Sequence, residues 1–247
     1  FALFFAIVFA LHWGLVRFPL PRKLVLLSAS LFFYGYWSWK FALMLLASAL
    51  LNHAAAVWID KSVDPKGRRR MIAFTVTANL LVLGVFKYTG FLFTRFMVPL
   101  AIPLCARLGT TDQLIALQEQ VLPFIEKIVL PVGISFYTFQ ALSYVVDVYW
   151  RKTPVARSGL DFANYLAFFP QLVAGPIVRA ADLLPQMAVF PDRSVHLDVG
   201  RAATLILGGL FKKMVVANWL SEHLADPVFA MPESYGGLDI LLGVYAY

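Results

Sequence analysis

Polar side chains that could line the path of a polar substrate are concentrated in one apolar block, from Leu130 to Arg179. The first part of this block is long enough to cross a bilayer. It carries hydroxyl, amide and carboxyl groups within it: Ser135, Tyr137, Thr138, Gln140, Ser143, Tyr144 and Asp147. Lipid offers such groups no hydrogen-bonding partner, so they must face protein or a water-filled cavity. The block therefore predicts a polar-lined interior and not a plain membrane anchor.

Three of these residues are spaced to share one face of a helix. Ser143 follows Gln140 by three positions and Tyr144 follows it by four, which places all three side chains on the same side. Amides and hydroxyls commonly bridge neighbouring membrane helices, and they also line tunnels that conduct polar groups. The spacing leaves both interpretations open. It marks Gln140 and Tyr144, together with Ser135, as candidates for a substrate path.

Asp147 lies near one end of the same helix, one turn before Arg151. The spacing favours an ion pair between the two side chains at the membrane surface. The alternative is an acid inside the membrane that orients a substrate group.

The second part of the block contains Gln171 and Arg179, which flank the sequence VAGPIV. An arginine after a Gly-Pro break can bind a phosphate or a carboxylate through two parallel hydrogen bonds. A basic residue at this point can equally mark the cytoplasmic boundary of the membrane. Both residues are therefore candidates for the substrate path, with a purely topological role for Arg179 left open.

The patterns that metal or nucleotide chemistry requires are missing from the sequence. The four histidines fall in no HExxH, HxxxH or Cys/His spacing, and no glycine-rich phosphate loop occurs. The single cysteine, Cys105, excludes an internal disulfide framework. We therefore expect no metal and no bound cofactor.

The composition is that of an integral membrane protein. Hydrophobic residues make up 60% of the 247 residues and charged residues only 14%, whereas a soluble domain has about 25% charged residues. The net charge of +7 arises from short clusters that flank apolar runs. A nucleic-acid-binding protein would instead gather its basic residues on one face, so that class is excluded.

The apolar runs predict an all-α fold, a polytopic membrane bundle with broken or re-entrant helices and cytoplasmic interfacial helices. A single helix over residues 24–59 would measure about 54 Å against a hydrocarbon core of about 30 Å, so this run must contain two spans. A break in the segment 35–40, GYWSWK, divides this run. Pro19 and Pro21 are expected to break any helix between Arg17 and Lys23. Spans are expected near 1–16, 24–36, 40–59, 71–93 and 128–150, an outer and partly re-entrant segment at 96–127, a broken or re-entrant helix at 162–178, an interfacial helix or short span at 199–220, and the start of a further span at 238–247.

Basic residues orient these spans. The segments 17–23, 60–70 and 151–157 are rich in lysine and arginine, and two spans between 24 and 59 place the first two segments on the same side. The positive-inside rule then assigns all three to the cytoplasm.

Several motifs, in a fixed order, resemble the membrane-bound O-acyltransferase family, and within it the bacterial alginate O-acetylation branch. They are SASLFFYGYW, VFKYTGFL, LPVGISFYTFQALSYVVDVYWRKTPVAR, FFPQLVAGPIVRAADLLPQ and GLFKKMVVANWL. The resemblance extends over essentially all 247 residues. It implies that the chain is the amino-terminal part of a single multi-pass domain in the bacterial inner membrane.

The resemblance also implies an activity. Such an enzyme passes an acyl group, here an acetyl group, through a tunnel from a cytoplasmic donor such as acetyl-CoA or another acyl carrier to hydroxyls of an exported polysaccharide. The partners it implies are the bilayer, the polysaccharide and extracytoplasmic partner proteins. The family's essential histidine lies in a later motif, and none of the four histidines present matches it. We therefore expect this chain to supply tunnel and scaffold, with no catalytic residue and little or no turnover of its own.

Two other functions fit the polar spans. One is a non-catalytic membrane scaffold of an acetylation or export complex. The other is a small-molecule transporter, which the absence of an internal repeat disfavours.

Overall fold

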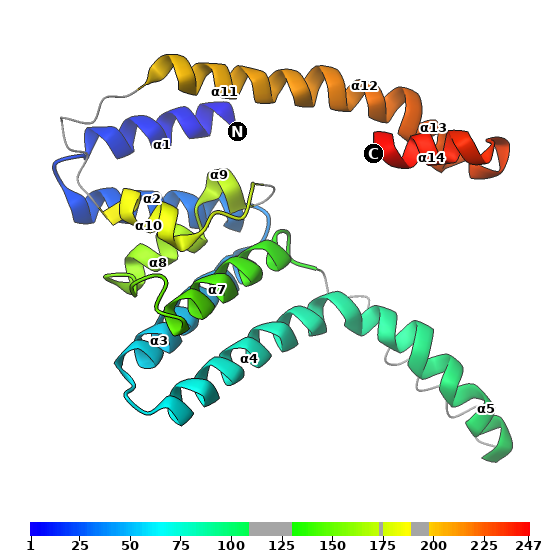
Figure 1. Ribbon diagram of the computed structural model, residues 1–247, viewed down its shortest axis with the longest axis horizontal. Coiled ribbons are helices and arrows are strands. Elements are labelled where there is room, and N and C mark those ends of the chain that lie inside the picture. Colours follow the sequence, from blue (N-terminus) through cyan, green and yellow to red (C-terminus); the bar gives the residue numbers. More distant parts are fainter. Residues whose placement is uncertain (109–129, 173–174, 189–197) are drawn as a thin grey trace. The chain divides into compact units, whose positions relative to one another are not determined.

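The structure, a computed structural model, describes residues 1–108, 130–172, 175–188 and 198–247. All elements in these ranges are helices, and no strand occurs among them (Figure 1). Within these ranges, three helices are long and apolar enough to cross a membrane: Trp39–Lys61, Pro65–Leu92 and Val199–Ala230. The predicted fold class, an all-α polytopic membrane bundle, is confirmed. The chain forms two compact units, Phe1–Pro191 and Asp192–Tyr247.

The first unit begins with four helices: α1 (Ala2–Gly14), α2 (Pro19–Gly35), α3 (Trp39–Lys61) and α4 (Pro65–Leu92). A π-helical segment, η1 (Phe93–Met97), connects α4 to α5 (Val98–Leu108). Of the segment 96–127, which was expected to be outer and partly re-entrant, residues 96–108 lie in η1 and α5, and residues 109–127 lie outside the described residues. Four shorter helices follow: α7 (Ile134–Tyr149), α8 (Gly159–Leu166), α9 (Phe169–Leu172) and α10 (Ala180–Ala188).

Two helices begin earlier than the sequence interpretation placed them. Pro19 and Pro21 do not break a helix, because they lie in the first turn of α2, where a missing amide N–H costs nothing. The carboxylate of Asp64 accepts hydrogen bonds from the amides of Lys66 and Gly67, at 3.0 and 2.8 Å, and so caps α4. The basic segment 60–70 is therefore largely helical.

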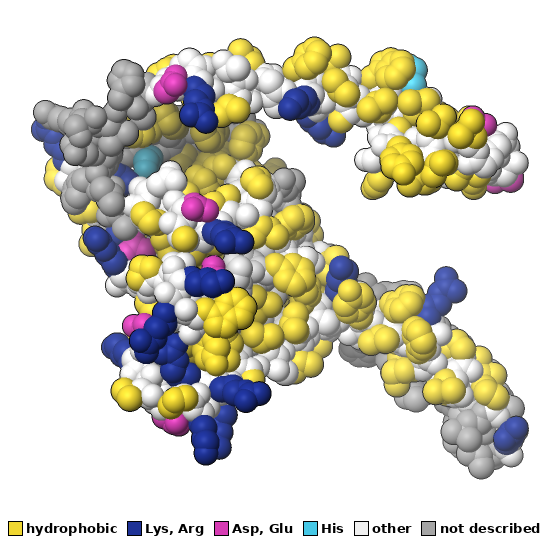
Figure 2. All heavy atoms as spheres, in the orientation of Figure 1, with side chains coloured by type: hydrophobic (Ala, Val, Ile, Leu, Met, Phe, Trp, Pro, Cys, Tyr) yellow, Lys and Arg dark blue, Asp and Glu magenta, His cyan; other side chains and the backbone are white. Residues whose placement is uncertain are grey.

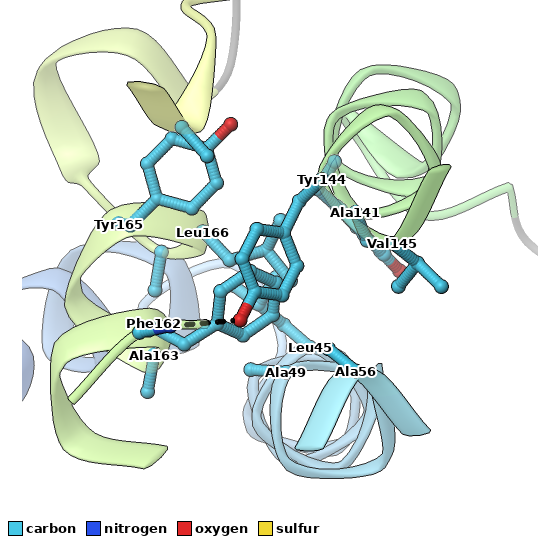
Figure 3. Packing of buried hydrophobic residues seen from close by; sticks show 14 of the residues in the cluster. Leu45, Ala49, Ala56, Ala141, Tyr144, Val145, Phe162, Ala163, Tyr165 and Leu166 are labelled. Atoms are coloured by element: carbon cyan, nitrogen blue, oxygen red, sulfur yellow. Dashed lines mark hydrogen bonds between the residues drawn. The ribbon is translucent and has the colours of Figure 1, made fainter. Parts of the chain in front are cut away.

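The core of the first unit forms where α7 packs against α3, α4 and α8. On α3 the buried residues recur every three or four positions, which defines one continuous face: Ala42, Leu45, Ala49, Asn52, Ala56 and Ile59. Alternating small residues on this face let neighbouring helices approach closely. Ala49 and Ala56 lie opposite the large side chains of α7 and α8 (Figure 3).

A reciprocal amide pair joins α3 to α4. The amide of Asn52 donates to Asn79 at 3.2 Å, and that of Asn79 donates back at 2.9 Å. Each amide also donates to a main-chain carbonyl one turn earlier in its own helix, Ser48 and Thr75 respectively. The pair therefore satisfies its donors inside an otherwise apolar interface.

Contacts on either side of segment 151–157 connect it to the other two basic segments of the first unit. The guanidinium of Arg68 donates to the main-chain oxygen of Tyr149 at 2.7 Å, which brings segment 60–70 to segment 151–157. Lys23 forms an ion pair with Asp161 of α8, which brings segment 17–23 to the same helix that follows segment 151–157. Basic side chains gather around the turn between α3 and α4, whereas hydrophobic side chains cover much of the remaining face (Figure 2).

The second unit is a long helix followed by a short one. Helical segments α11 (Val199–Phe211), η2 (Lys212–Ala217), α12 (Asn218–Leu220), η3 (Ser221–Ala225) and α13 (Asp226–Ala230) are continuous and reach 32 residues. A 3₁₀ turn, η4 (Pro232–Ser234), leads to α14 (Gly237–Ala246). Gly243 lets α14 approach closely, because a Cβ there would lie 3.1 Å from Val228.

Candidate functional site

The candidate site is built around α7, a helix with one broad face buried in the first unit. Its first residue follows Gly133, whose left-handed backbone (φ 74°) turns the chain into the helix. The hydroxyl of Tyr34 on α2 donates to the main-chain oxygen of Val132 at 2.7 Å and holds this turn in place. Nine residues of α7 are buried. In the first unit, α7 is therefore an inner helix of the bundle.

Two of the candidate residues converge on a single atom. The amides of Gln140 and Gln171 both donate to the main-chain oxygen of Tyr165, at 3.3 and 3.4 Å. Tyr165 lies in the last turn of α8, where carbonyl groups have no partner within the helix. The two glutamines supply that partner from α7 and α9, so they stabilise the break between α8 and α9.

Tyr144 lies at the centre of a buried aromatic cluster. Its ring centroid is 4.3 Å from that of Phe162, which in turn is 5.7 Å from that of Tyr165, and all three side chains are fully buried. The hydroxyl of Tyr144 accepts a hydrogen bond from the amide of Ala156 at 3.0 Å (Figure 3). Tyr144 thus joins α7 to the segment that precedes α8.

The expected ion pair between Asp147 and Arg151 does not form. Among the described residues the one ion pair is that of Lys23 with Asp161. The pairing prediction is wrong because α7 ends at Tyr149 and Arg151 adopts a left-handed backbone, φ 58°. The amides of Arg151 and Lys152 then bond to the carbonyls of Val148 and Asp147, at 3.0 and 2.8 Å. This is a Schellman motif, which turns Arg151 out of the helical i+4 position.

The second half of the block folds through a close backbone approach. A Cβ on Gly175 would lie 2.4 Å from the Cα of Gln171, so only glycine fits at this position. The hydroxyl of Tyr165 donates to the main-chain oxygen of Val178 at 2.8 Å. Arg179 follows and is exposed, and its main-chain oxygen accepts from the first amides of α10.

The structure thus brings together three of the six sequence-derived candidates, Gln140, Tyr144 and Gln171, around Tyr165. Ser135 is half-buried, and within the described ranges neither it nor Arg179 has a side-chain hydrogen bond or ion pair. Ser143 donates to the main-chain oxygen of Gln140 at 2.9 Å, which is a contact within its own helix. That these residues line an acyl path stays a prediction.

A cavity that the sequence interpretation missed lies beside this group. Its volume is about 310 Å³, and residues of α1, α2, α8, α9 and α10 line it. Arg22 is among them, although the sequence placed it in a solvent-facing basic loop. The sequence offered one signal for the position of Arg22. Prolines are favoured in the first turn of a helix, so Pro19 and Pro21 indicate a helix start that places Arg22 within α2. Among the described residues no three metal-ligating side chains lie together.

The first unit is therefore an all-α membrane bundle with an inner helix and a broken helix bonded to it. No family model and no solved structure matches the chain. Among curated proteins, the chain is 35% identical over 235 residues to "Probable alginate O-acetylase AlgI" of Azotobacter vinelandii, which covers 92% of this chain and 42% of the relative. It is 34% identical over 233 residues to the protein of the same name in Pseudomonas aeruginosa, which covers 92% of the chain and 40% of the relative.

A third relative carries a different name. The chain is 30% identical over 236 residues to "Peptidoglycan O-acetyltransferase" of Helicobacter pylori, which covers 84% of this chain and 40% of that protein. The chain thus spans about two fifths of the length of the curated relatives it matches. These matches confirm the resemblance drawn from the motifs: the chain is related to the alginate O-acetylation branch of the membrane-bound O-acyltransferase family.

Proposed function

We propose that the protein is a membrane-embedded O-acyltransferase, which transfers an acetyl group from a cytoplasmic donor to hydroxyls of an exported polysaccharide. The observation that carries the proposal is the similarity over 92% of the chain to proteins named for alginate O-acetylation. The relative named for peptidoglycan widens the class of acceptor to exported glycans in general. In the proposal, the described residues form scaffold and part of the acyl path.

The contacts of the basic segments support the orientation that this activity requires. Segments 17–23, 60–70 and 151–157 of the first unit are connected through the contacts of Lys23 and Arg68. Lysine and arginine are enriched on the cytoplasmic side of membrane proteins. We propose that these segments face the cytoplasm at a bacterial inner membrane, where an acyl donor such as acetyl-CoA is present.

The chemistry divides the candidate residues by role. In transfer from a thioester, the carbon–sulfur bond breaks, a carbon–oxygen bond to the acceptor forms, and a base takes the hydroxyl proton. The family resemblance assigns that base to a histidine in a later motif, and no histidine of this chain receives the role. Gln140, Tyr144 and Gln171 bond to main-chain groups and hold the broken helix. The exposed guanidinium of Arg179 is free to bind an anionic group of the donor.

The test is acetyl transfer by the full-length protein in proteoliposomes. Labelled acetyl-CoA is supplied on one side, and alginate or peptidoglycan fragments are supplied on the other. Label on either glycan supports the proposal. A folded protein that associates with partner proteins but transfers no label to any glycan supports the non-catalytic scaffold instead, and solute uptake without transfer supports the transporter.

The role of Arg179 is tested in the same assay. Arg179→Ala is expected to raise the KM for the donor about tenfold, since charge-assisted hydrogen bonds to an anion are lost. The matched control is Arg69→Ala, which removes another exposed arginine at a different place in the first unit. An unchanged KM in Arg179→Ala, with stability also unchanged, contradicts the role.

A further inference from the structure

Arg22 is a buried cation without a described partner. It lies in the first turns of α2 and is only 8% exposed. Its main-chain amide bonds to Phe18, but its guanidinium has no hydrogen bond and no ion pair with any described residue. A buried charge is stable only when it is paired, so Arg22 calls for an anion.

The neighbouring charges do not supply that anion. Asp161 is the acid that lines the same cavity, and its carboxylate is committed to the ion pair with Lys23 and to the hydroxyl of Ser158, at 2.9 Å. Among the described residues that line the cavity, the two cations Arg22 and Lys23 face the one acid Asp161, which leaves one positive charge uncompensated. The polar end of the cavity is therefore suited to a ligand with one negative charge.

Other polar atoms at this end also lack partners. Nδ1 of His12 and Oδ1 of Asn164 are buried and have no hydrogen-bond partner among the described residues. The amide nitrogen of Asn164 is already engaged, because it donates to the main-chain oxygens of Lys23 and Leu160. Buried polar groups are nearly always satisfied, by protein or by bound water. Nδ1 of His12 can donate to an anionic head in the tautomer that protonates it, whereas Oδ1 of Asn164 only accepts and so calls for a water or a hydroxyl donor beside Arg22.

The remainder of the cavity is apolar and aromatic. Its walls include Phe5, Phe9 and Trp13 on α1, and Phe168 and Phe169 at the start of α9. Its volume of about 310 Å³ lies at the lower end of the range of roughly 300–1,000 Å³ for small-ligand sites. A hydrophilic anion would leave these walls unused, whereas an alkyl chain would cover them.

We propose that this cavity binds one anionic amphiphile, with its phosphate or carboxylate head at Arg22 and the start of its alkyl chain against the aromatic walls. An acidic membrane phospholipid and a fatty acid share this chemistry. The site is separate from the Tyr165 group, and it stands whether or not the protein transfers acetyl groups.

The experiment measures lipid binding by the full-length protein after delipidation in detergent. Native mass spectrometry and thermal unfolding are recorded with phosphatidylglycerol, oleate, phosphatidylcholine and inorganic phosphate. Phosphatidylglycerol or oleate is expected to bind at one copy and to raise the melting temperature, and comparison of the two identifies the source. Equal binding of phosphatidylcholine, or full binding of inorganic phosphate alone, overturns the proposal.

Two variants assign the effect to Arg22. Arg22→Gln is expected to weaken anionic lipid binding about tenfold, because a charge-assisted hydrogen bond is lost. Arg17→Gln, an exposed arginine in the same basic segment, is the matched control and should leave binding unchanged. Equal loss in both variants overturns the assignment.

The melting temperature of the lipid-free protein shows whether Arg22 binds a ligand or is paired within the protein. Removing an unpaired buried charge should leave the melting temperature of the delipidated Arg22→Gln protein unchanged or raised. A lowered melting temperature there, with lipid binding retained, shows that Arg22 is paired within the protein and overturns the proposal. Arg22→Lys keeps the charge and is expected to retain most of the binding if the site is as proposed.

Discussion

At the scale of single residues, several buried polar side chains of the first unit bond to main-chain groups at or near helix ends. Gln140 and Gln171 bond to the oxygen of Tyr165, and Tyr144 bonds to the amide of Ala156. In an apolar environment an unpaired amide or carbonyl is costly, so each such contact stabilises one particular path of the chain.

Tyr144→Phe tests this role. The ring remains, but the amide of Ala156 loses its partner inside the protein, which should lower the free energy of unfolding by about 1–3 kcal/mol. The measurement is denaturation in detergent, with Tyr36→Phe as control, because Tyr36 is 89% exposed. Equal stability of the two variants would contradict the structural role of the hydroxyl.

At the scale of elements, two features join helices that lie far apart in the sequence. Arg68 donates to the last carbonyl of α7 and stacks over the ring of Tyr149, with 5.6 Å from Cζ to the centroid. Its positive charge also compensates the negative end of the α7 dipole. Gly175 allows the chain to pass directly over Gln171, and so returns it towards the end of α8.

Arg68→Met should separate α4 from the end of α7. Loss of a hydrogen bond to a charged donor lowers the free energy of unfolding by about 1.5–3 kcal/mol. Arg69→Met is the control, since the adjacent residue is exposed and its loss should change stability by less than about 0.5 kcal/mol. If thermal unfolding in detergent shows the same shift for both, the contact is not stabilising.

Gly175→Ala should destabilise the block that contains the candidate residues. The added Cβ overlaps Gln171, and overpacking of this kind costs about 1–3 kcal/mol. Size-exclusion profiles and melting temperatures should show aggregation or reduced stability. Gly84→Ala is the control, because a Cβ there meets no atom within 4 Å. A wild-type profile for Gly175→Ala would contradict the prediction that the added Cβ destabilises the block.

At the scale of the whole molecule, the proposal that segments 17–23, 60–70 and 151–157 face the cytoplasm predicts which side of the bilayer each turn of the first unit faces. In a background with Cys105 replaced by serine, single cysteines at positions 63, 157 and 36 test it. An impermeant maleimide applied from the periplasm should label position 36 and spare positions 63 and 157 until the inner membrane is permeabilised. Labelling of 63 and 157 from opposite sides would contradict the orientation.

The fold class follows from composition and apolar run length, but the packing does not. On α3, polar and apolar residues are not segregated, so the buried face from Ala42 to Ile59 is not recognisable from polarity. Gln140 and Gln171 converge on Tyr165 from positions 25 and 6 residues away in the sequence. No local pattern encodes this convergence. Local patterns placed Arg22 in a loop, whereas it lies inside α2. They placed Arg151 on the same helix as Asp147, whereas it lies just beyond the end of α7.

The amide pair between α3 and α4 has a consequence for the order of assembly. Sliding one helix past the other by a single turn would separate Asn52 from Asn79 and leave both side-chain amide oxygens without a donor in hydrocarbon, since the nitrogens keep their bonds to Ser48 and Thr75. A buried polar pair of this kind specifies axial register, as it does in coiled coils. The helices α3 and α4 are consecutive in the sequence and joined by the short segment 62–64, so the pair can form as soon as both helices are inserted. The α3–α4 hairpin would then present a face of fixed register before α7 is synthesised, and α7 would pack onto a surface that is already in place.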